Sequence, residues 1–246
     1  MMLLNLFYIL LILYVVLLIA RITGFKIIEI LTCAGAVSLN LFELILLYNK
    51  SGNLPVFNVF ESFLLISFII GATGLFVLFK GDFSSEVRLW IWIEILILFI
   101  IMVFCPKEAS SPLYDHGYVY IVLFHVFRCV SLALMLFATA WFIQFIIQRE
   151  MDERISMLSL QGRNYLVLSA VFFLMGEYVG IIWCQKGWGD FWTWSQTFFQ
   201  STLVVLYLML AFHIPGKGRK SADIRCVIGG LSGVFMLVLT LMRSFY

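Results

Sequence analysis

Two histidines lie inside long apolar segments of the sequence, and imidazole is a common metal ligand. His125 lies within the segment 118–142, about 10 Å from its start at the rise of an α-helix. His213 closes the segment 198–213, just before the helix-breaking sequence IPG. Ionisable groups inside membrane segments are energetically costly and usually mark a functional site. His125 is therefore a candidate functional residue, with hydrogen-bonded packing as the structural alternative, whereas the residues alone suggest an interfacial position for His213.

Arg128 lies one helical turn from His125, on the same face. A histidine with a neighbouring guanidinium suits a ligand that carries both a metal and carboxylates. The alternative is a buried ion pair with Glu94 or Glu177, and the residues alone favour neither interpretation.

A dense aromatic stretch, KGWGDFWTWSQTFFQ, occupies 186–200 between two apolar segments. Four of the seven tryptophans fall between Trp183 and Trp194. An interfacial anchor, which is the structural alternative, needs only one or two tryptophans. Aromatic faces near histidine and arginine favour a flat apolar ligand with carboxylate groups.

The remaining reactive residues form few motifs. The five cysteines include no C-x-x-C or C-x-x-C-H, so the chain is not itself a c-type cytochrome. Cys105 and Cys184 lie at segment ends where a disulfide can persist, although packing as small apolar residues is the commoner role. Asn58 and Glu61 in NVFE predict a helix N-cap and its N3 partner. No nucleophile motif, phosphate loop or zinc spacing is present.

The amino-acid composition indicates which kind of secondary structure and fold positions these residues. The 246 residues are 63% hydrophobic and 12% charged, with a mean hydropathy of +1.05. This predicts an all-α, polytopic membrane helical bundle, a single membrane domain over 1–246 in a lipid bilayer. The net charge of +2 without a basic cluster argues against nucleic acid. The first segment lacks a basic start and a cleavage site, which predicts an uncleaved helix.

Eight apolar segments have roughly the 17–25 residues that a membrane span requires. They are 3–20, 27–47, 58–79, 89–104, 118–142, 165–183, 198–213 and 227–242. With both termini extracytoplasmic, the inner loops hold eleven of the sixteen Lys and Arg residues and the outer side holds four, because Arg128 lies within a span. The positive-inside rule therefore predicts this orientation, with the tryptophan-rich loop 185–197 outside.

The segment WGDFWTWS, Trp188 to Ser195, resembles the tryptophan-rich WWD motif of the haem-handling cytochrome c assembly proteins. The closest resemblance is to the CcsA (ResC) family, the membrane core of System II cytochrome c biogenesis. It covers roughly residues 54–246: LPVFNVFESFLLIS is similar to the family's N-[LV]-[YF]-E-S segment, and VLFHVF is similar to the segment with its external histidine ligand. AFH, nineteen residues after Trp194, matches its intramembrane histidine.

The chain also departs from the family pattern in two places. Ser195 stands where the motif has an aspartate, and Arg243, in LMRSFY, stands where the family has a second external histidine. An external haem would therefore lack one axial ligand from this chain, and His116 is the other nearby imidazole.

The resemblance implies a cofactor, haem b bound non-covalently, with His125 and His213 as metal ligands. It implies stacking and binding contacts from a further group of residues: Trp188, Gly189, Asp190, Phe191, Trp192, Trp194, Arg128 and Arg243. Lys186 is a further cation suited to the haem carboxylates. The chain would present haem outside the membrane for covalent attachment to the CxxCH cysteines of apocytochrome c. It would contribute to catalysis by positioning the haem, not by supplying a nucleophile.

The implied partners are a CcsB (ResB)-like membrane protein, apocytochrome c and a thiol-reducing partner. The chain would then be at most one subunit of a haem-attachment synthetase, in the bacterial cytoplasmic membrane rather than the thylakoid. The alternatives are a haem exporter, a degenerate scaffolding relative, and a b-type cytochrome subunit for electron transfer. The last fits least, because His125 and His213 differ in depth by about 10–15 Å and cannot share one iron.

Overall fold

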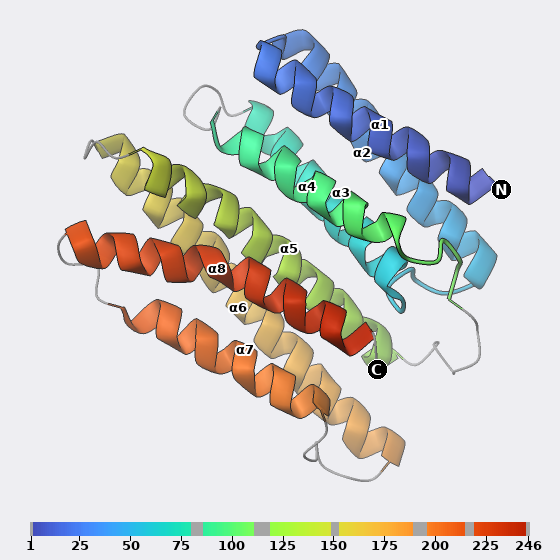
Figure 1. Ribbon diagram of the computed structural model, residues 1–246. Coiled ribbons are helices and arrows are strands. Elements are labelled where there is room, and N and C mark those ends of the chain that lie inside the picture. Colours follow the sequence, from blue (N-terminus) through green and yellow to red (C-terminus); the bar gives the residue numbers. More distant parts are fainter. Residues whose placement is uncertain are drawn as a thin grey trace. The chain divides into compact units, whose positions relative to one another are not determined.

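A computed structural model describes residues 2–79, 86–110, 119–148, 153–188, 196–214 and 219–244 (Figure 1). In these ranges the chain forms eight α-helices and no strand, which confirms the predicted all-α class. The helices are α1 (Met2–Thr23), α2 (Lys26–Ser51), α3 (Val59–Phe79), α4 (Val87–Val103), α5 (Val119–Ile147), α6 (Glu153–Trp188), α7 (Gln196–His213) and α8 (Arg219–Ser244).

Six of the described helices are long and apolar enough to cross a membrane, which identifies an integral membrane protein. Their apolar spans are Leu3–Thr23, Lys26–Ser51, Val59–Phe79, Val119–Ile147, Met157–Lys186 and Ser221–Met242, and Phe199–His213 is a shorter apolar helix. The eight spans and the side on which the termini lie stay predictions.

Two helices extend well beyond the predicted spans. The segment 165–183 lies inside α6, which has 36 residues, and 227–242 lies inside α8, which has 26. The predicted spans stop at charged residues, whereas backbone hydrogen bonding continues through them.

The contacts between residues divide the chain into two compact units, Met1–Asp115 with α1–α4 and His116–Tyr246 with α5–α8. We call them unit 1 and unit 2 and describe each by itself. A single membrane domain over 1–246, with a haem-handling core from about residue 54, stays a prediction.

In unit 1, α1 packs against α2 and α4, and α3 packs against the same two helices. Figure 1 shows α1 and α2 as an adjacent pair joined by a very short turn. Gly24 makes this turn possible, since its φ of 78° belongs to the left-handed region that side chains disfavour. The amide of Phe25 then donates to the carbonyl of Ala20 at 3.1 Å, which satisfies the end of α1.

Aromatic rings form much of the core of unit 1. Phe7 stacks on Phe99 with ring centroids 5.5 Å apart, and Tyr14 contacts Phe99 at 5.0 Å. Gly74 leaves room for the indole of Trp92, because a Cβ at this glycine would lie 2.7 Å from the Trp92 ring. A side chain there would force α3 and α4 apart.

The start of α3 confirms the predicted cap. The Glu61 amide donates to the Asn58 side-chain oxygen at 2.7 Å, and the Asn58 amide donates to the Glu61 carboxylate at 3.4 Å. These reciprocal bonds satisfy two backbone donors at the helix start. Glu61 also accepts a hydrogen bond from the Ser110 amide at 2.7 Å, so the cap fastens the segment after α4 as well.

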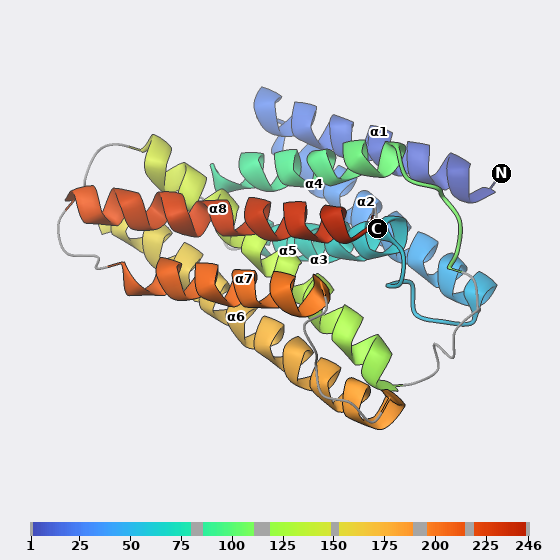
Figure 2. The same cartoon turned by 60° about the horizontal axis from the view of Figure 1, so that its bottom comes forward.

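In unit 2, α5 is the central helix and packs against both α6 and α8, while α7 packs mainly on α8 (Figure 2). Every residue of α5 from Ser131 to Phe142 is buried. The Phe142 ring lies between two glycines: a Cβ at Gly162 of α6 would be 2.9 Å from it, and one at Gly229 of α8 would be 2.8 Å from it. Small residues at such crossings let membrane helices approach closely.

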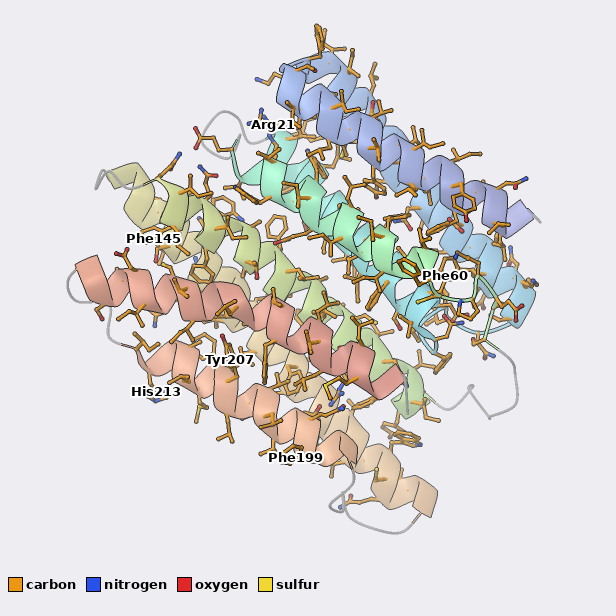
Figure 3. All side chains as sticks on the ribbon, in the orientation of Figure 1. Arg21, Phe60, Phe145, Phe199, Tyr207 and His213 are labelled. Atoms are coloured by element: carbon orange, nitrogen blue, oxygen red, sulfur yellow. The ribbon has the colours of Figure 1, made fainter. Side chains whose placement is uncertain are left out.

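Hydrogen bonds between helices reinforce this packing. The hydroxyls of Ser131 and Ser169 each donate to the other residue's carbonyl, at 3.0 and 2.9 Å. Tyr207 of α7 donates from its hydroxyl to the carbonyl of Ile228 in α8 at 2.8 Å. Figure 3 shows Tyr207 midway along α7, between the labelled Phe199 and His213. Bonds of this kind are commonly worth about 1 kcal/mol in membrane bundles.

Candidate functional site

Three helix ends of unit 2 meet where α5 begins, α6 ends and α7 begins (Figure 1). Arg128 of α5 ties them together. Its Nε and Nη2 donate to the Glu177 carboxylate of α6 at 3.2 and 2.5 Å. Its Nη2 also donates to the hydroxyl of Ser201 in α7. Of the two ion pairs considered from the sequence, the one with Glu177 is present.

The Arg128 guanidinium is only partly buried in this cluster. Its side chain is 16% exposed and that of Glu177 is 15% exposed. The guanidinium lies over the rings of Phe124 and Phe173, at 4.6 and 5.5 Å from their centroids. Aromatic faces attract a cation, so the rings hold it in place in addition to the ion pair.

One nitrogen of Arg128 is left for another partner. Among the described residues, no hydrogen bond involves Nη1, which carries two N–H donors. A ligand carboxylate could accept hydrogen bonds from these two N–H groups. Because Glu177 already balances the positive charge, Arg128 would act on such a ligand as a directed donor rather than as a net charge.

His125 lies on α5, three residues before Arg128, and is half-buried. Its ring meets the edge of Phe124 at a centroid distance of 5.3 Å. Phe124 in turn contacts Trp183 of α6 at 6.2 Å. His125 is therefore joined through one aromatic ring to the first tryptophan of the cluster recognised in the sequence.

The last turns of α6 also meet the first turn of α5. Lys186 donates from its ammonium group to the Tyr120 hydroxyl at 3.0 Å and lies 4.8 Å from the centroid of the Tyr120 ring. This contact fixes the end of α6 beside the helix that carries His125. Lys186 was expected near a carboxylate ligand, and in the structure its partner is Tyr120.

Much of the tryptophan-rich motif lies outside the described residues. These are Gly189, Asp190, Phe191, Trp192, Trp194 and Ser195, and His116 is outside as well. Trp188 is the last residue of α6 and Arg243 lies in the last turn of α8; for both, only the backbone is described. Of the two helices that flank the motif, α6 contacts Arg128 through Glu177, eleven residues before its end, and α7 contacts it through Ser201, five residues after its start.

His213 lies at the other end of α7 and is exposed (Figure 3). Its Nδ1 is 2.7 Å from the carbonyl oxygen of Met209. A carbonyl only accepts, so Nδ1 donates here, and in a neutral imidazole this arrangement leaves the Nε2 lone pair for a metal.

His125 and His213 are far apart along unit 2. Ser201, which contacts Arg128, precedes His213 by twelve residues, or about 18 Å of helix. His125 lies a further turn beyond Arg128, so the axial separation is about 20 Å. This exceeds the separation estimated from the sequence and agrees with the expectation that the two histidines cannot share one iron.

None of the described cysteines, Cys105 and Cys184 included, forms a disulfide in the structure. Cys105 directly follows α4, where its Sγ lies 3.6 Å from the carbonyl of Ile101. Burial raises the pKa of the Cys105 thiol, and nearby Lys107 opposes this only in part. The thiol is therefore a poor nucleophile at neutral pH.

Some members of the site were not expected. Ser201 and Phe173 contact Arg128, yet a serine near the start of one apolar segment and a phenylalanine in the middle of another carry no distinctive pattern. The spacing of Phe173 and Glu177, four residues apart, places them on one helical face and was an available signal.

No group of three or more His, Cys, Asp or Glu side chains forms a metal site within the described ranges. Comparison with models of known protein families, with curated proteins and with solved structures finds no match to the chain.

Proposed function

We propose that this protein binds haem b non-covalently and presents it on the extracytoplasmic side of a bacterial cytoplasmic membrane for attachment to apocytochrome c. It would act with a CcsB-like membrane partner, and a thiol-reducing protein would keep the apocytochrome cysteines reduced. In this proposal the chain spans the membrane eight times, with both termini and the tryptophan-rich segment outside.

One observation carries the proposal. Arg128 contacts both α6 and α7, the helices that flank the tryptophan-rich segment, and lies one turn from His125. The helix that carries His125 thus contacts both helices that flank the tryptophan-rich segment, although His125 and that segment are more than 60 residues apart in the sequence. This agrees with the order and spacing in which the sequence resembles the CcsA family.

The residues at this end fit a haem. His125 is half-buried and would supply one axial ligand, and Nη1 of Arg128 would donate to a propionate. The aromatic side chains of the motif, Trp188, Phe191, Trp192 and Trp194, would offer stacking faces. When bound, the haem supplies the vinyl groups that react with the apocytochrome thiols and the iron whose reduced state this reaction needs.

His213 would have a different part. Its exposed ring, with Nδ1 held by Met209, suits receipt of haem at the opposite end of unit 2. At about 20 Å from His125, it would serve a second and separate binding position.

The visible spectrum of the purified chain tests the proposal. We expect the protein from a haem-replete host to co-purify with b-type haem that acidic acetone extracts, because the haem is not covalently bound. A colourless protein that stays colourless when produced with a CcsB-like partner would contradict the proposal. Membership of a complex with a CcsB-like protein would distinguish this function from a haem exporter, which needs no apocytochrome.

Arg243 gives a further prediction. A guanidinium has no lone pair for iron, so it cannot replace the histidine of the family pattern, although it can pair with a propionate. We expect Arg243→His to add an axial ligand and shift the external haem to a six-coordinate, low-spin spectrum. Arg243→Ala should weaken retention without changing the coordination number. A parent haem that is already bis-histidine and unmoved by Arg243→His would point to a ligand from His116 or a partner.

A further inference from the structure

Helix α2 buries a line of polar side chains inside unit 1. Glu29, Asn40 and Glu43 share one helical face, and their exposed fractions are 2%, 0% and 0%. Glu29 and Glu43 are fourteen residues apart, or about 21 Å along the helix. The line therefore covers most of the roughly 30 Å of a bilayer's hydrocarbon core.

At one end of this line the carboxylate is paired. Glu29 lies 3.5 Å from the Arg88 guanidinium of α4 and accepts a hydrogen bond from the Trp92 indole at 3.2 Å. Glu29 is thus a buried carboxylate with both a cation and a hydrogen-bond donor beside it.

At the other end of unit 1, Glu61 is satisfied by backbone amides. Its carboxylate accepts from Phe57 at 3.1 Å, from Asn58 at 3.4 Å and from Ser110 at 2.7 Å. Three amide donors thus satisfy this carboxylate. Glu29 of α2 and Glu61 of α3 are therefore both buried carboxylates with partners.

Glu43, fourteen residues after Glu29 on the same face of α2, lacks such partners in the part of the chain that the structure describes. Neither carboxyl oxygen of Glu43 has a hydrogen-bond partner among the described residues, and its side chain is fully buried. Asn40, one turn away, bonds the Ser67 hydroxyl of α3 at 2.9 Å. The Tyr14 hydroxyl of α1 lies beside Gly71 of α3, where a Cβ would be 3.1 Å from it.

Unit 1 contains several other titratable side chains. The helices and the segment around Glu43 contribute Tyr14, Cys33, Glu61, Arg88, Glu94 and Lys107. Arg88 is engaged by Glu29, and the Lys107 ammonium bonds the Val103 carbonyl and lies over the Phe7 ring. Among the described residues, the cations Arg88 and Lys107 thus have partners other than Glu43, and neither forms an ion pair with it.

An ionised carboxylate without a partner in such surroundings would cost many kcal/mol, whereas a neutral acid costs far less. We propose that unit 1 carries protons across the membrane, with Glu43 as the group that takes up and releases the proton between the two satisfied carboxylates, Glu29 and Glu61. A proton from water converts the Glu43 carboxylate to the neutral acid, and release on the opposite side restores the carboxylate, so no other reactant is consumed. Among the described residues neither the Glu43 carboxyl nor the Tyr14 hydroxyl has a hydrogen-bond partner, so in this proposal water entering the line would connect Glu43 to the two ends.

Proton flux measures this function directly and without haem, so its result is independent of the haem proposal. The full chain is reconstituted in liposomes with a pH-sensitive dye inside, and a potassium diffusion potential drives protons inward. We expect the parent to acidify the vesicles faster than empty liposomes do. Glu43→Gln keeps the side-chain volume but removes the exchangeable proton, and should lower the rate about tenfold or more. Glu43→Asp should retain part of the proton flux.

Glu108→Gln is the matched control, because Glu108 is exposed and only its backbone carbonyl accepts from Asn58. It should leave the flux unchanged. A hydrophobic carbodiimide tests the protonated acid separately: it adds to a neutral carboxyl within the membrane, and peptide mapping should find the adduct on Glu43. A parent no faster than empty liposomes, a Glu43→Gln flux equal to the parent's, or a Glu43 unmodified by the carbodiimide would each overturn the proposal.

Discussion

A His125→Ala variant is expected to lose the external haem that the parent chain retains. His125 is half-buried beside Phe124 and is the described imidazole at the end of unit 2 that carries Arg128. Without it the iron would have no axial ligand from this helix, and one axial bond commonly decides whether a haem without covalent attachment survives purification. Haem content per protein, measured by the pyridine haemochrome spectrum, should fall by about tenfold or more.

Added imidazole should partly restore the haem of His125→Ala, since a free ligand can occupy the space that the ring leaves. A His213→Ala variant is the comparison within the same chain. It should lower the amount of haem loaded while leaving the spectrum of the bound haem unchanged, because His213 lies at the opposite end of α7. If both variants load and retain haem as the parent does, the ligand assignments are wrong.

Breaking the ion pair at the same end is expected to have the largest effect on stability. Glu177→Gln leaves the Arg128 guanidinium partly buried without a counter-charge. Removal of one partner from a fully buried pair costs 3–5 kcal/mol, and for side chains that are 15–16% exposed we expect about 2–4 kcal/mol. Unfolding in mixed micelles with increasing denaturing detergent measures this loss.

The double variant Arg128→Met with Glu177→Met separates charge from packing. Apolar side chains of similar length at both positions should recover most of the lost stability, because no buried charge remains. The double variant should still bind haem less well, since the Nη1 donor is gone. Equal stability of the parent and Glu177→Gln would mean that the pair contributes little to the fold.

The elements of the fold could be predicted from the sequence, but their ends could not. Apolar runs of membrane length gave the eight described helices, because backbone groups in lipid must be satisfied within the helix. The predicted span 165–183 covers only part of α6, Glu153–Trp188. Charges such as Arg163 and Lys186 mark where a helix leaves the hydrocarbon, not where its hydrogen bonds stop.

The partner of Arg128 at the candidate site could likewise not be predicted from the sequence. Arg128 had two possible partners in the sequence, Glu94 and Glu177, and only packing decides between them. In the structure Glu177 holds Arg128, and the Glu94 carboxyl has no hydrogen-bond partner among the described residues. The Asn58–Glu61 cap was predictable because it depends only on neighbours in the sequence. The motif residues from Gly189 to Trp194 lie outside the described ranges, so their part in the site stays a prediction.

The helices differ in length in a way that concerns the surrounding lipid. Helix α4 has 17 residues and α5 has 29, which correspond to about 26 and 44 Å. A hydrocarbon layer of about 30 Å matches the first and is much thinner than the second. Tilt or local thickening of the bilayer must absorb the difference, at a fraction of a kcal/mol per Å. Acyl-chain length therefore sets how far the first turns of α5, with His125, rise toward water: thin bilayers expose them, and thick bilayers draw them into the hydrocarbon.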